Sequence, residues 1–596
     1  METILFKVAK RLVVFAVMVA LVAMFPVKSD AAKIEPQLLV ALAQGGEASY
    51  LVYLQEQADL AQAGAITERE ARGLFVYKAL KEVADRTQDP LLAYLATEVR
   101  AGRAKEVKSF FSVNAIGVTS TEPTLRGLAA FPGVEQIIKA PVVSIPEPQA
   151  GVELPTVNGV EWNIAKVRAP EVWAKGVFGQ GVVVANIDTG VQYNHPALVN
   201  QYRGNIGGVF NHNYNWWDPS KVCGNPSNTP CDNSGHGTHT MGTMVGDDGG
   251  SNQIGVAPQA EWLACKGCES GSCSGFALLE CGDFILAPWN LNKANPDPNK
   301  RPHVVNNSWG GGSGDSWYQG VVQSWRAAGI FPAFSNGNGG PSCNTSGSPG
   351  DYPESFSSGA TDINDNIATF SSRGPSAFGV KKPDISAPGV SVRSSVPTNS
   401  YSSYSGTSMA SPHTAGEVAL VWSLYPGLSR DIPNTERKLR PATQILNTTA
   451  GCGGDGPTTH PNNVFGWGRE DAFQAYSPFN IYTDRSVYNP GGTMNVMLSL
   501  VSPLNTSTNV DAYVAVQTPG GQLLFFPGFG ITPVPYISNY SVAPLLEVFD
   551  FNILSYAFGS EAPGNYNWFS VLTPPGADPL NPANRVSLDA APFTKE

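Results

Sequence analysis

The segment Val183-Val-Ala-Asn-Ile-Asp188-Thr-Gly190 is the main basis for the fold expected in the middle of this chain. The β-branched run over residues 182–187 is typical of a buried strand, and it ends at an acidic residue followed by a glycine turn. Comparable apolar runs at residues 304–305 and 330–334 predict two further strands. An aspartate in this position often does no more than end a strand, so the stretch alone does not establish chemistry.

Helix-like patterns alternate with these strands. The expected helices cover residues 238–245, Gly275–Leu286, 318–328 and 408–424. This alternation predicts an α/β fold, a parallel sheet with helices on both faces. Reactive groups in such sheets collect beyond the carboxyl ends of the strands, where Asp188 is expected.

Two further motifs carry candidate chemistry. Ser234-Gly-His236-Gly-Thr-His239 opens one of the expected helices. Its two histidines could be structural or could bind a metal, but helical zinc proteases have a glutamate directly after the first histidine, where this chain has glycine. Tyr404-Ser-Gly406-Thr-Ser408-Met-Ala-Ser-Pro412-His413 places Ser408 at a helix start, where it either caps the helix or serves as a nucleophile.

In this order, the three motifs resemble those of the subtilisin-like serine peptidases (subtilases), most closely the bacillopeptidase F branch. The resemblance covers residues 158–476 and implies a subtilisin-like fold. Further stretches match the family pattern: Asn306-Asn-Ser-Trp-Gly310, Asn336-Gly-Asn338-Gly-Gly-Pro341, Phe370-Ser-Ser-Arg-Gly-Pro375, Pro383-Asp-Ile-Ser-Ala-Pro-Gly389 and Phe465-Gly-Trp-Gly468.

The resemblance implies a catalytic triad of Asp188, His236 and Ser408, which makes the chain a serine endopeptidase that works through an acyl-enzyme. It also implies that the side chain of Asn338 and the backbone N–H of Ser408 form the oxyanion hole. Asn336 is the rival for this role, and the family pattern favours Asn338 because it follows a glycine and precedes Gly-Pro.

The family pattern also suggests how a substrate is held. Ser308-Trp309-Gly310 is expected to be an edge strand that pairs with an extended peptide substrate. Trp309 either lines a pocket or only packs in the core. His239 and His413 are expected to be structural rather than catalytic.

No metal ligands are assigned, and the chemistry requires no cofactor. Many relatives bind calcium through an aspartate shortly after the catalytic one, but the matching segment here, Asn194-His-Pro-Ala197-Leu198, has alanine instead. The loop over residues 249–255, which is Asn-rich and longer in those relatives, is short. That calcium site is expected to be absent, while other structural calcium sites stay unassigned.

Four segments of the chain differ in composition and in residue pattern. Residues 1–32 hold Lys and Arg before an apolar run and read as a secretory signal peptide rather than a membrane anchor, so the protein is expected to be secreted, without a membrane span in its mature form. Residues 33–150, with helix-like stretches at 68–83 and 91–109, lie where the family keeps an inhibitory α+β prodomain, and cleavage is expected between Pro146 and Val160. Residues 158–476 form the peptidase domain. Residues 477–596 have an all-β pattern that favours a small sandwich of accessory function.

The eight cysteines all lie between Cys223 and Cys452. An even number in an exported chain favours disulfides. Cys223 and Cys231 are expected to pair locally, and Cys343 with Cys452 by elimination. The cluster Cys265, Cys268, Cys273 and Cys281 starts as C-x-x-C but lacks a second such motif, so two bridges are favoured over zinc.

The composition bears on the classes of partner that the protein can bind. The chain has 596 residues, 15% charged residues and a formal net charge of −11, and this acidic balance argues against nucleic-acid binding. The expected partners are protein substrates and the chain's own propeptide, with a monomer as the expected state. Two alternatives remain: an esterase or lipase-type hydrolase, whose triad runs in the order Ser, Asp, His, and a non-catalytic extracellular binding protein.

Overall fold

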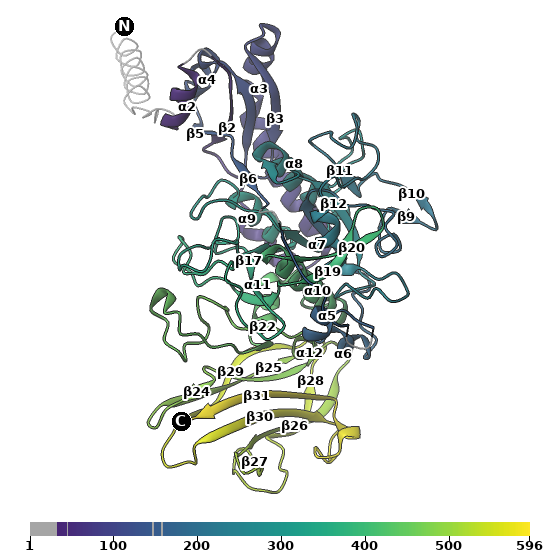
Figure 1. The fold of residues 1–596 in the computed structure, drawn as a ribbon, viewed down its shortest axis with the longest axis vertical. Helices are drawn as coiled ribbons and strands as arrows, with labels where there is room; N and C mark the ends of the chain where they lie inside the picture. The colour runs from purple at the N-terminus through teal and green to yellow at the C-terminus, as the bar shows by residue number, and fades with distance from the viewer. Residues whose placement is uncertain (1–32, 44–45, 146–147, 157–158) are drawn as a thin grey trace, which may run out of the picture. The chain divides into compact units, whose positions relative to one another are not determined.

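The computed structural model describes residues 33–43, 46–145, 148–156 and 159–596 (Figure 1). The predicted signal peptide lies outside these residues. The chain divides into two compact units. One takes in the described residues up to Gln57 with Val83–Ser109 and Asn114–Ala140. The other takes in Ala58–Glu82, Phe110–Val113 and everything from Pro141 onward.

A nine-stranded sheet forms the centre of the larger unit. All of its neighbouring strands are parallel except the edge pair β22–β21, which is antiparallel. The predicted parallel α/β sheet is therefore confirmed. In spatial order the strands are β11 (Trp216–Trp217), β12 (Glu261–Lys266), β8 (Val183–Asp188), β15 (Val304–Asn307), β16 (Phe331–Ser335), β17 (Phe356–Thr361), β18 (Ile385–Pro388), β22 (Arg469–Glu470) and β21 (Thr443–Gln444).

Helices cover both faces of this sheet. Asn186 in β8 donates to the carbonyl oxygen of Gly237 in α7 (His236–Val245), and α7 packs beside α10 (Thr407–Leu424). The next residue, Ile187, lies close to Leu278 of α8 (Gly275–Leu286), which packs beside α9 (Gln319–Ala327). Because successive residues of a strand point to opposite faces, the two helix pairs lie on opposite sides.

Shorter elements complete this unit. Three-stranded ladders are formed by β13 (Cys268–Glu269), β14 (Ser272–Ser274) and β6 (Val142–Ser144), and by β19 (Val392–Val396), β20 (Ser400–Ser405) and β7 (Gln149–Ala150). The remaining α-helices are α5 (Trp162–Lys166), α6 (Ala169–Trp173), α11 (Ile432–Leu439) and α12 (Ala472–Tyr476).

The smaller unit contains a five-stranded sheet in the order β1-β5-β2-β4-β3, with the bounds Lys33–Ile34, Val134–Lys139, Ala48–Leu54, Ala115–Ser120 and Ala104–Phe110. Its helices include α2 (Pro36–Leu42) and α4 (Glu122–Ala129), consistent with the predicted α+β prodomain. The expected helix over 91–109 is wrong in its second half. Helix α3 (Arg69–Arg100) ends before Gly102, which adopts a φ of 69°, and the chain returns as strand β3.

The C-terminal part is the predicted sandwich. One sheet has the order β23-β25-β29, and the other has the order β24-β31-β30-β26-β27 with β28 beside β26. Apolar side chains of both sheets, such as Val496 and Trp568, share one core. The strands are β23 (Phe479–Thr483), β24 (Val487–Tyr488), β25 (Thr493–Val501), β26 (Thr508–Gln517), β27 (Leu523–Phe525), β28 (Ile537–Val542), β29 (Glu547–Ala557), β30 (Gly564–Thr573) and β31 (Ser587–Lys595).

Four disulfides join the eight cysteines. The predicted pairs Cys223–Cys231 and Cys343–Cys452 are both present. The cluster forms two bridges as expected, Cys265–Cys281 and Cys268–Cys273. A search of the described helices finds none with the length and apolar character needed to cross a membrane.

Candidate active site

Asp188 and His236 form a buried hydrogen-bonded pair. Asp188 ends β8, and its Oδ1 lies 2.8 Å from Nδ1 of His236, the first residue of α7. The same oxygen accepts the N–H of Thr189 at 2.7 Å, so the carboxylate is fixed in place. Nε2 of His236 is buried and has no hydrogen-bond partner among the described residues. That nitrogen is therefore free to exchange a proton.

Asp232 ties the strand end to the helix start. It accepts Oγ1–H of Thr189, the residue after Asp188, at 2.9 Å, and the N–H of Thr238, two residues after His236, at 2.9 Å. The two residues of the pair thus share one rigid support. Sequence reasoning missed Asp232, whose only signal is its position four residues before the histidine.

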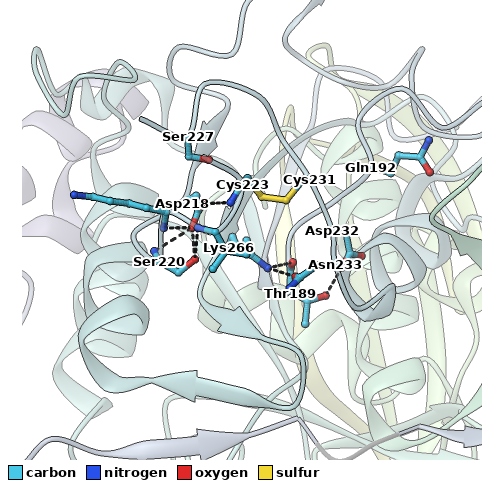
Figure 2. Close-up of a disulfide and its surroundings, with 12 residues drawn as sticks. Thr189, Gln192, Asp218, Ser220, Cys223, Ser227, Cys231, Asp232, Asn233 and Lys266 are labelled. Atoms are coloured by element: carbon cyan, nitrogen blue, oxygen red, sulfur yellow. Dashed lines mark hydrogen bonds between the residues drawn. A yellow bond between two sulfur atoms is a disulfide. The ribbon is translucent and has the colours of Figure 1, made fainter. Parts of the chain in front are cut away.

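The turn before His236 is also held by a disulfide and by a buried lysine (Figure 2). The bridge Cys223–Cys231 ends directly before Asp232. Nζ of Lys266, a fully buried residue at the end of β12, donates to the carbonyl oxygen of Thr189 at 2.6 Å and to Oδ1 of Asn233 at 2.7 Å (Figure 2). No local sequence pattern pointed to this lysine.

Close approach explains the glycine after the histidine. A Cβ atom at position 237 would lie 2.1 Å from the carbonyl oxygen of Gly190, so only glycine fits. His239 turns to another part of the fold, where its Nε2 contacts the carbonyl oxygens of Val392 at 3.0 Å and Ser402 at 3.1 Å. Burial lowers the pKa of His239 to about 3. His239 is structural, as expected.

Ser408 is the second residue of α10. Its hydroxyl donates to the carbonyl oxygen of Ser308 at 3.3 Å, and the hydroxyl of Ser308 donates to the carbonyl oxygen of Ser408 at 3.0 Å. The side chain of Ser308 thus orients residue 408. From the sequence, Ser308 was expected only to pair with an extended substrate. His413, further along α10, contacts Met409 and Asn163 at 2.8 Å each and is structural, as expected.

The amide of Asn338 is aimed at the start of α10. Its Oδ1 accepts the N–H of Thr407 at 2.9 Å and the hydroxyl of Thr407 at 2.7 Å, so Nδ2 is the donor that remains for a substrate oxygen. A Cβ atom at Gly406 would lie 3.3 Å from this Nδ2 and 3.7 Å from the backbone nitrogen of Ser408, so the two donors converge. Asn336 instead donates to the carbonyl oxygen of Ser372 at 2.8 Å inside the core.

A cavity of about 390 Å³ lies over these groups, within the size range of substrate pockets. Ser408, Asn338, Trp309 and Gly310 all line it. Trp309 is almost fully buried and packs edge-on against Tyr318 at 5.1 Å between ring centroids, so it serves both as a pocket wall and as core.

The chain's own segment β6 occupies the expected substrate strand position. Ser144 and Gly310 exchange both backbone hydrogen bonds at 3.2 Å in an antiparallel bridge. On its other side β6 pairs with β14, where Ser272 lies opposite Ser144. The predicted edge strand over Ser308-Trp309-Gly310 is wrong in extent, because β15 ends at Asn307 and only Gly310 forms an isolated bridge. The β6 segment therefore lies between Gly310 on one side and strand β14 on the other, and the sequence indicated only the first. The cysteine cluster was the available signal for the second side, because Cys273 lies in β14.

No cluster of three or more His, Cys, Asp or Glu side chains suited to a metal occurs in the part of the chain that the structure describes. The absence of metal ligands and cofactors stays a prediction.

Comparison with known proteins places the chain. The sequence model of the Subtilase family matches residues 179–468. Bacillopeptidase F of Bacillus subtilis (strain 168) is 42% identical over 433 residues, which is 69% of this chain and 29% of that protein. Subtilisin E of the same strain is 32% identical over 54% of this chain and 74% of its own length, and subtilisin DY of Bacillus licheniformis is 36% identical over 45% and 87%. The chain thus spans less than a third of the length of bacillopeptidase F but most of the length of the subtilisins. Residues 179–468 contain the Asp188–His236 pair, Ser408 and the residues that line the cavity, apart from Ser144, and the chain belongs to the subtilase family of serine peptidases.

Proposed function

We propose that the protein is a secreted endopeptidase that hydrolyses peptide bonds in proteins through an acyl-enzyme at Ser408. The observation that carries the proposal is the Asp188–His236 hydrogen bond of 2.8 Å, with the opposite ring nitrogen of the histidine unpaired among the residues that the structure describes.

The proton path follows from this arrangement. Asp188 holds Nδ1 of His236, so Nε2 is the basic nitrogen that takes the proton of Ser408 as its oxygen attacks the substrate carbonyl. The imidazolium then gives this proton to the leaving amine. Water repeats the cycle on the acyl-enzyme, and the negative charge of Asp188 stabilises the imidazolium in both halves.

Two donors serve the oxyanion of the tetrahedral intermediate. The side-chain amide of Asn338 is oriented by Thr407, and the backbone N–H of Ser408 lies at the positive end of α10. Because both are fixed before the reaction, they stabilise the developing charge without reorganisation.

Self-inhibition is the second part of the proposal. Residues 33–150 act as a propeptide whose β6 segment lies in the groove as a substrate does, between β14 and Gly310. Ser144 lines the cavity with Ser408, and Gln149 pairs with Ser405 of β20. The bond cut during maturation therefore lies between Ser144 and Gln149, a range that overlaps the start of the one expected from the sequence, Pro146 to Val160.

The protein acts as a monomer outside the cell. Four disulfides suit an oxidising compartment. The sandwich over residues 477–596 acts as an accessory domain that stabilises the peptidase domain.

The experiment is to express the full chain, sequence the N-terminus of the secreted form, and assay it on casein and on tributyrin. We expect a new N-terminus between residues 145 and 149, hydrolysis of casein only, and inactivation by a sulfonyl fluoride with the label on Ser408. Hydrolysis of tributyrin would favour the esterase alternative. A protein that neither hydrolyses casein nor reacts with the fluoride would favour a binding protein, and a mature form that starts near residue 33 would contradict the propeptide.

A further inference from the structure

The first half of helix α3 packs in the larger unit, although it belongs to the predicted propeptide. Residues 58–82 form one compact unit with the peptidase domain. Val76 is fully buried there, and Leu80 and Ala63 are nearly so. These contacts lie outside the β6 segment and outside the lining of the cavity at Ser408.

Arg72 binds the C-terminal end of helix α9. Its guanidinium donates to three carbonyl oxygens: that of Ala327 at 2.6 Å, that of Arg326 at 3.0 Å and that of Arg430 at 3.0 Å. The last carbonyl groups of a helix lack intrahelical partners and carry the negative end of its dipole, so a cation is favoured there.

Arg301 makes the reciprocal contact from the peptidase side. It is fully buried and donates to the carbonyl oxygen of Arg69 at 2.6 Å and to that of Ala328 at 3.0 Å, while Arg69 donates back to the carbonyl oxygen of Arg301 at 2.9 Å. A Cβ atom at Gly73 would lie 2.1 Å from Nη1 of Arg301, so a side chain there would displace the guanidinium.

The guanidinium of Arg430 is poorly satisfied by hydrogen bonds in this cluster. Its Nη1 reaches the carbonyl oxygen of Gly329 only at 3.5 Å, and its Nη2 is buried and finds no hydrogen-bond partner in the described parts of the chain. Among the described residues, no carboxylate forms an ion pair with Arg69, Arg72, Arg301 or Arg430. Burial, and after it the neighbouring arginines, lower the pKa of Arg301 to about 9. The cluster thus combines attraction to carbonyl oxygens with repulsion between like charges.

We propose that residues 58–82 are a second anchor of the propeptide, and that the four-arginine cluster sets how long the cleaved propeptide stays on the peptidase domain. The partner is the chain's own helix, recognised by carbonyl groups at the end of α9 rather than by the substrate groove. The inference rests on the proposed function, because it requires that residues 33–150 become a separate polypeptide after cleavage.

Opposite effects at two arginines test the proposal. Arg72→Gln removes the guanidinium that donates to three carbonyl oxygens, so the cleaved propeptide should dissociate at least about tenfold faster. Arg430→Gln removes a guanidinium that contributes repulsion and one long hydrogen bond, so dissociation should be slower. Arg86→Gln is the matched control, because Arg86 lies in the same helix but forms an exposed ion pair with Glu56. The release rate is followed on the self-processed full chain by size-exclusion chromatography of quenched samples.

Arg72→Lys is a second variant that keeps the proposal testable if Arg72→Gln fails to fold. Lysine keeps the charge but cannot serve three carbonyl groups in a fork, so its release rate should fall between those of the wild type and Arg72→Gln. After complete release, every variant should hydrolyse a short peptide with the wild-type kcat/KM. Equal release rates in all variants, or changes of the same sign at positions 72 and 430, would overturn the anchor. If the wild-type chain hydrolyses casein but is never cut between residues 144 and 160, the proposed propeptide fails instead, and the anchor fails with it.

Discussion

The peptidase region and the C-terminal sandwich bury their polar and apolar groups in different ways. In the peptidase region, buried polar side chains such as Asp188, His236 and Ser408 gather where strands end and helices start. In the sandwich, a cavity of about 540 Å³ is lined mainly by apolar and aromatic side chains such as Phe558 and Trp568. From this contrast we expect the first region to perform the chemistry and the second to contribute packing. Changes in the first should therefore alter turnover, and changes in the second should alter unfolding.

Ser408→Ala should produce the largest effect. Without the nucleophile, kcat should fall by about six orders of magnitude, the size reported for loss of the serine in a subtilisin. Full-length precursor should also accumulate if maturation is self-catalysed. Turnover of a peptide substrate and electrophoresis of the purified chain measure both effects.

The control lies at the other end of the same helix. Ser423 donates to the carbonyl oxygen of Leu420 at 3.0 Å and lies far along α10 from the cavity, so Ser423→Ala should leave turnover unchanged. A Ser408→Ala protein that processes itself without a helper protease would contradict the role of Ser408 in maturation.

Asn338→Ala should have the next largest effect. Loss of one oxyanion donor lowers kcat by about 10²–10³ in a subtilisin, and KM should change little because the donor acts mainly on the transition state. Thr407→Val provides a graded comparison, because it removes one of the two hydrogen bonds that orient the amide and keeps the donor. Its kcat should fall by less than about tenfold. Equal losses in the two variants would show that Asn338 acts through Thr407 and not on the oxyanion.

The sequence was sufficient for the parts that depend on local pattern. The β-branched run before Asp188 predicted β8, and the glycines at positions 237 and 406 marked places of close approach near His236 and Ser408. It was insufficient where distant segments meet. Asp232 and Lys266 act by contacts with residue 189, which lies 43 and 77 positions away in the chain. No local periodicity reports such contacts. The same holds for β6 in the groove and for the arginines that grip α9.

Lys438→Met should change stability and not turnover. Lys438 is buried in α11 and donates to the carbonyl oxygen of Ser477 and, at 2.5 Å, to Oδ1 of Asn480, so it joins the peptidase region to the sandwich. Removing it leaves two buried acceptors unsatisfied and should lower the free energy of unfolding by about 2–4 kcal/mol. Denaturant unfolding, measured in the Ser408→Ala background to prevent self-digestion, tests this.

The neighbouring residue supplies the control for that change. Arg437 is exposed and lies 3.8 Å from Asp550, so Arg437→Gln should shift the free energy of unfolding by no more than about 0.5 kcal/mol. If Lys438→Met lowers kcat/KM while leaving unfolding unchanged, the division of roles between the two regions is wrong.

Glu470→Gln should have the smallest effect at neutral pH, and its signature is a pH dependence. Glu417 and Glu470 are buried near each other, and three of their four carboxylate oxygens have no hydrogen-bond partner among the described residues. Burial raises the pKa of both carboxyl groups, and the charge of Glu470 raises that of Glu417 further. The folded protein therefore keeps protons that the unfolded chain has already released.

The sign of the effect follows from that difference. The stabilisation is present in full below the carboxyl pKa of the unfolded chain and is lost as the pH rises toward the folded values, by up to about 1.4 kcal/mol per pH unit for each proton. Glu470→Gln keeps an oxygen for the hydroxyl of Thr414, which lies 2.8 Å from Glu470, and removes one titration, so the loss toward alkaline pH should become shallower. Thermal unfolding in the Ser408→Ala background from about pH 5 to about pH 9 measures the slope. The exposed Glu171→Gln variant should keep the slope of its parent. If Glu470→Gln keeps that slope as well, the buried pair is not what limits alkaline stability.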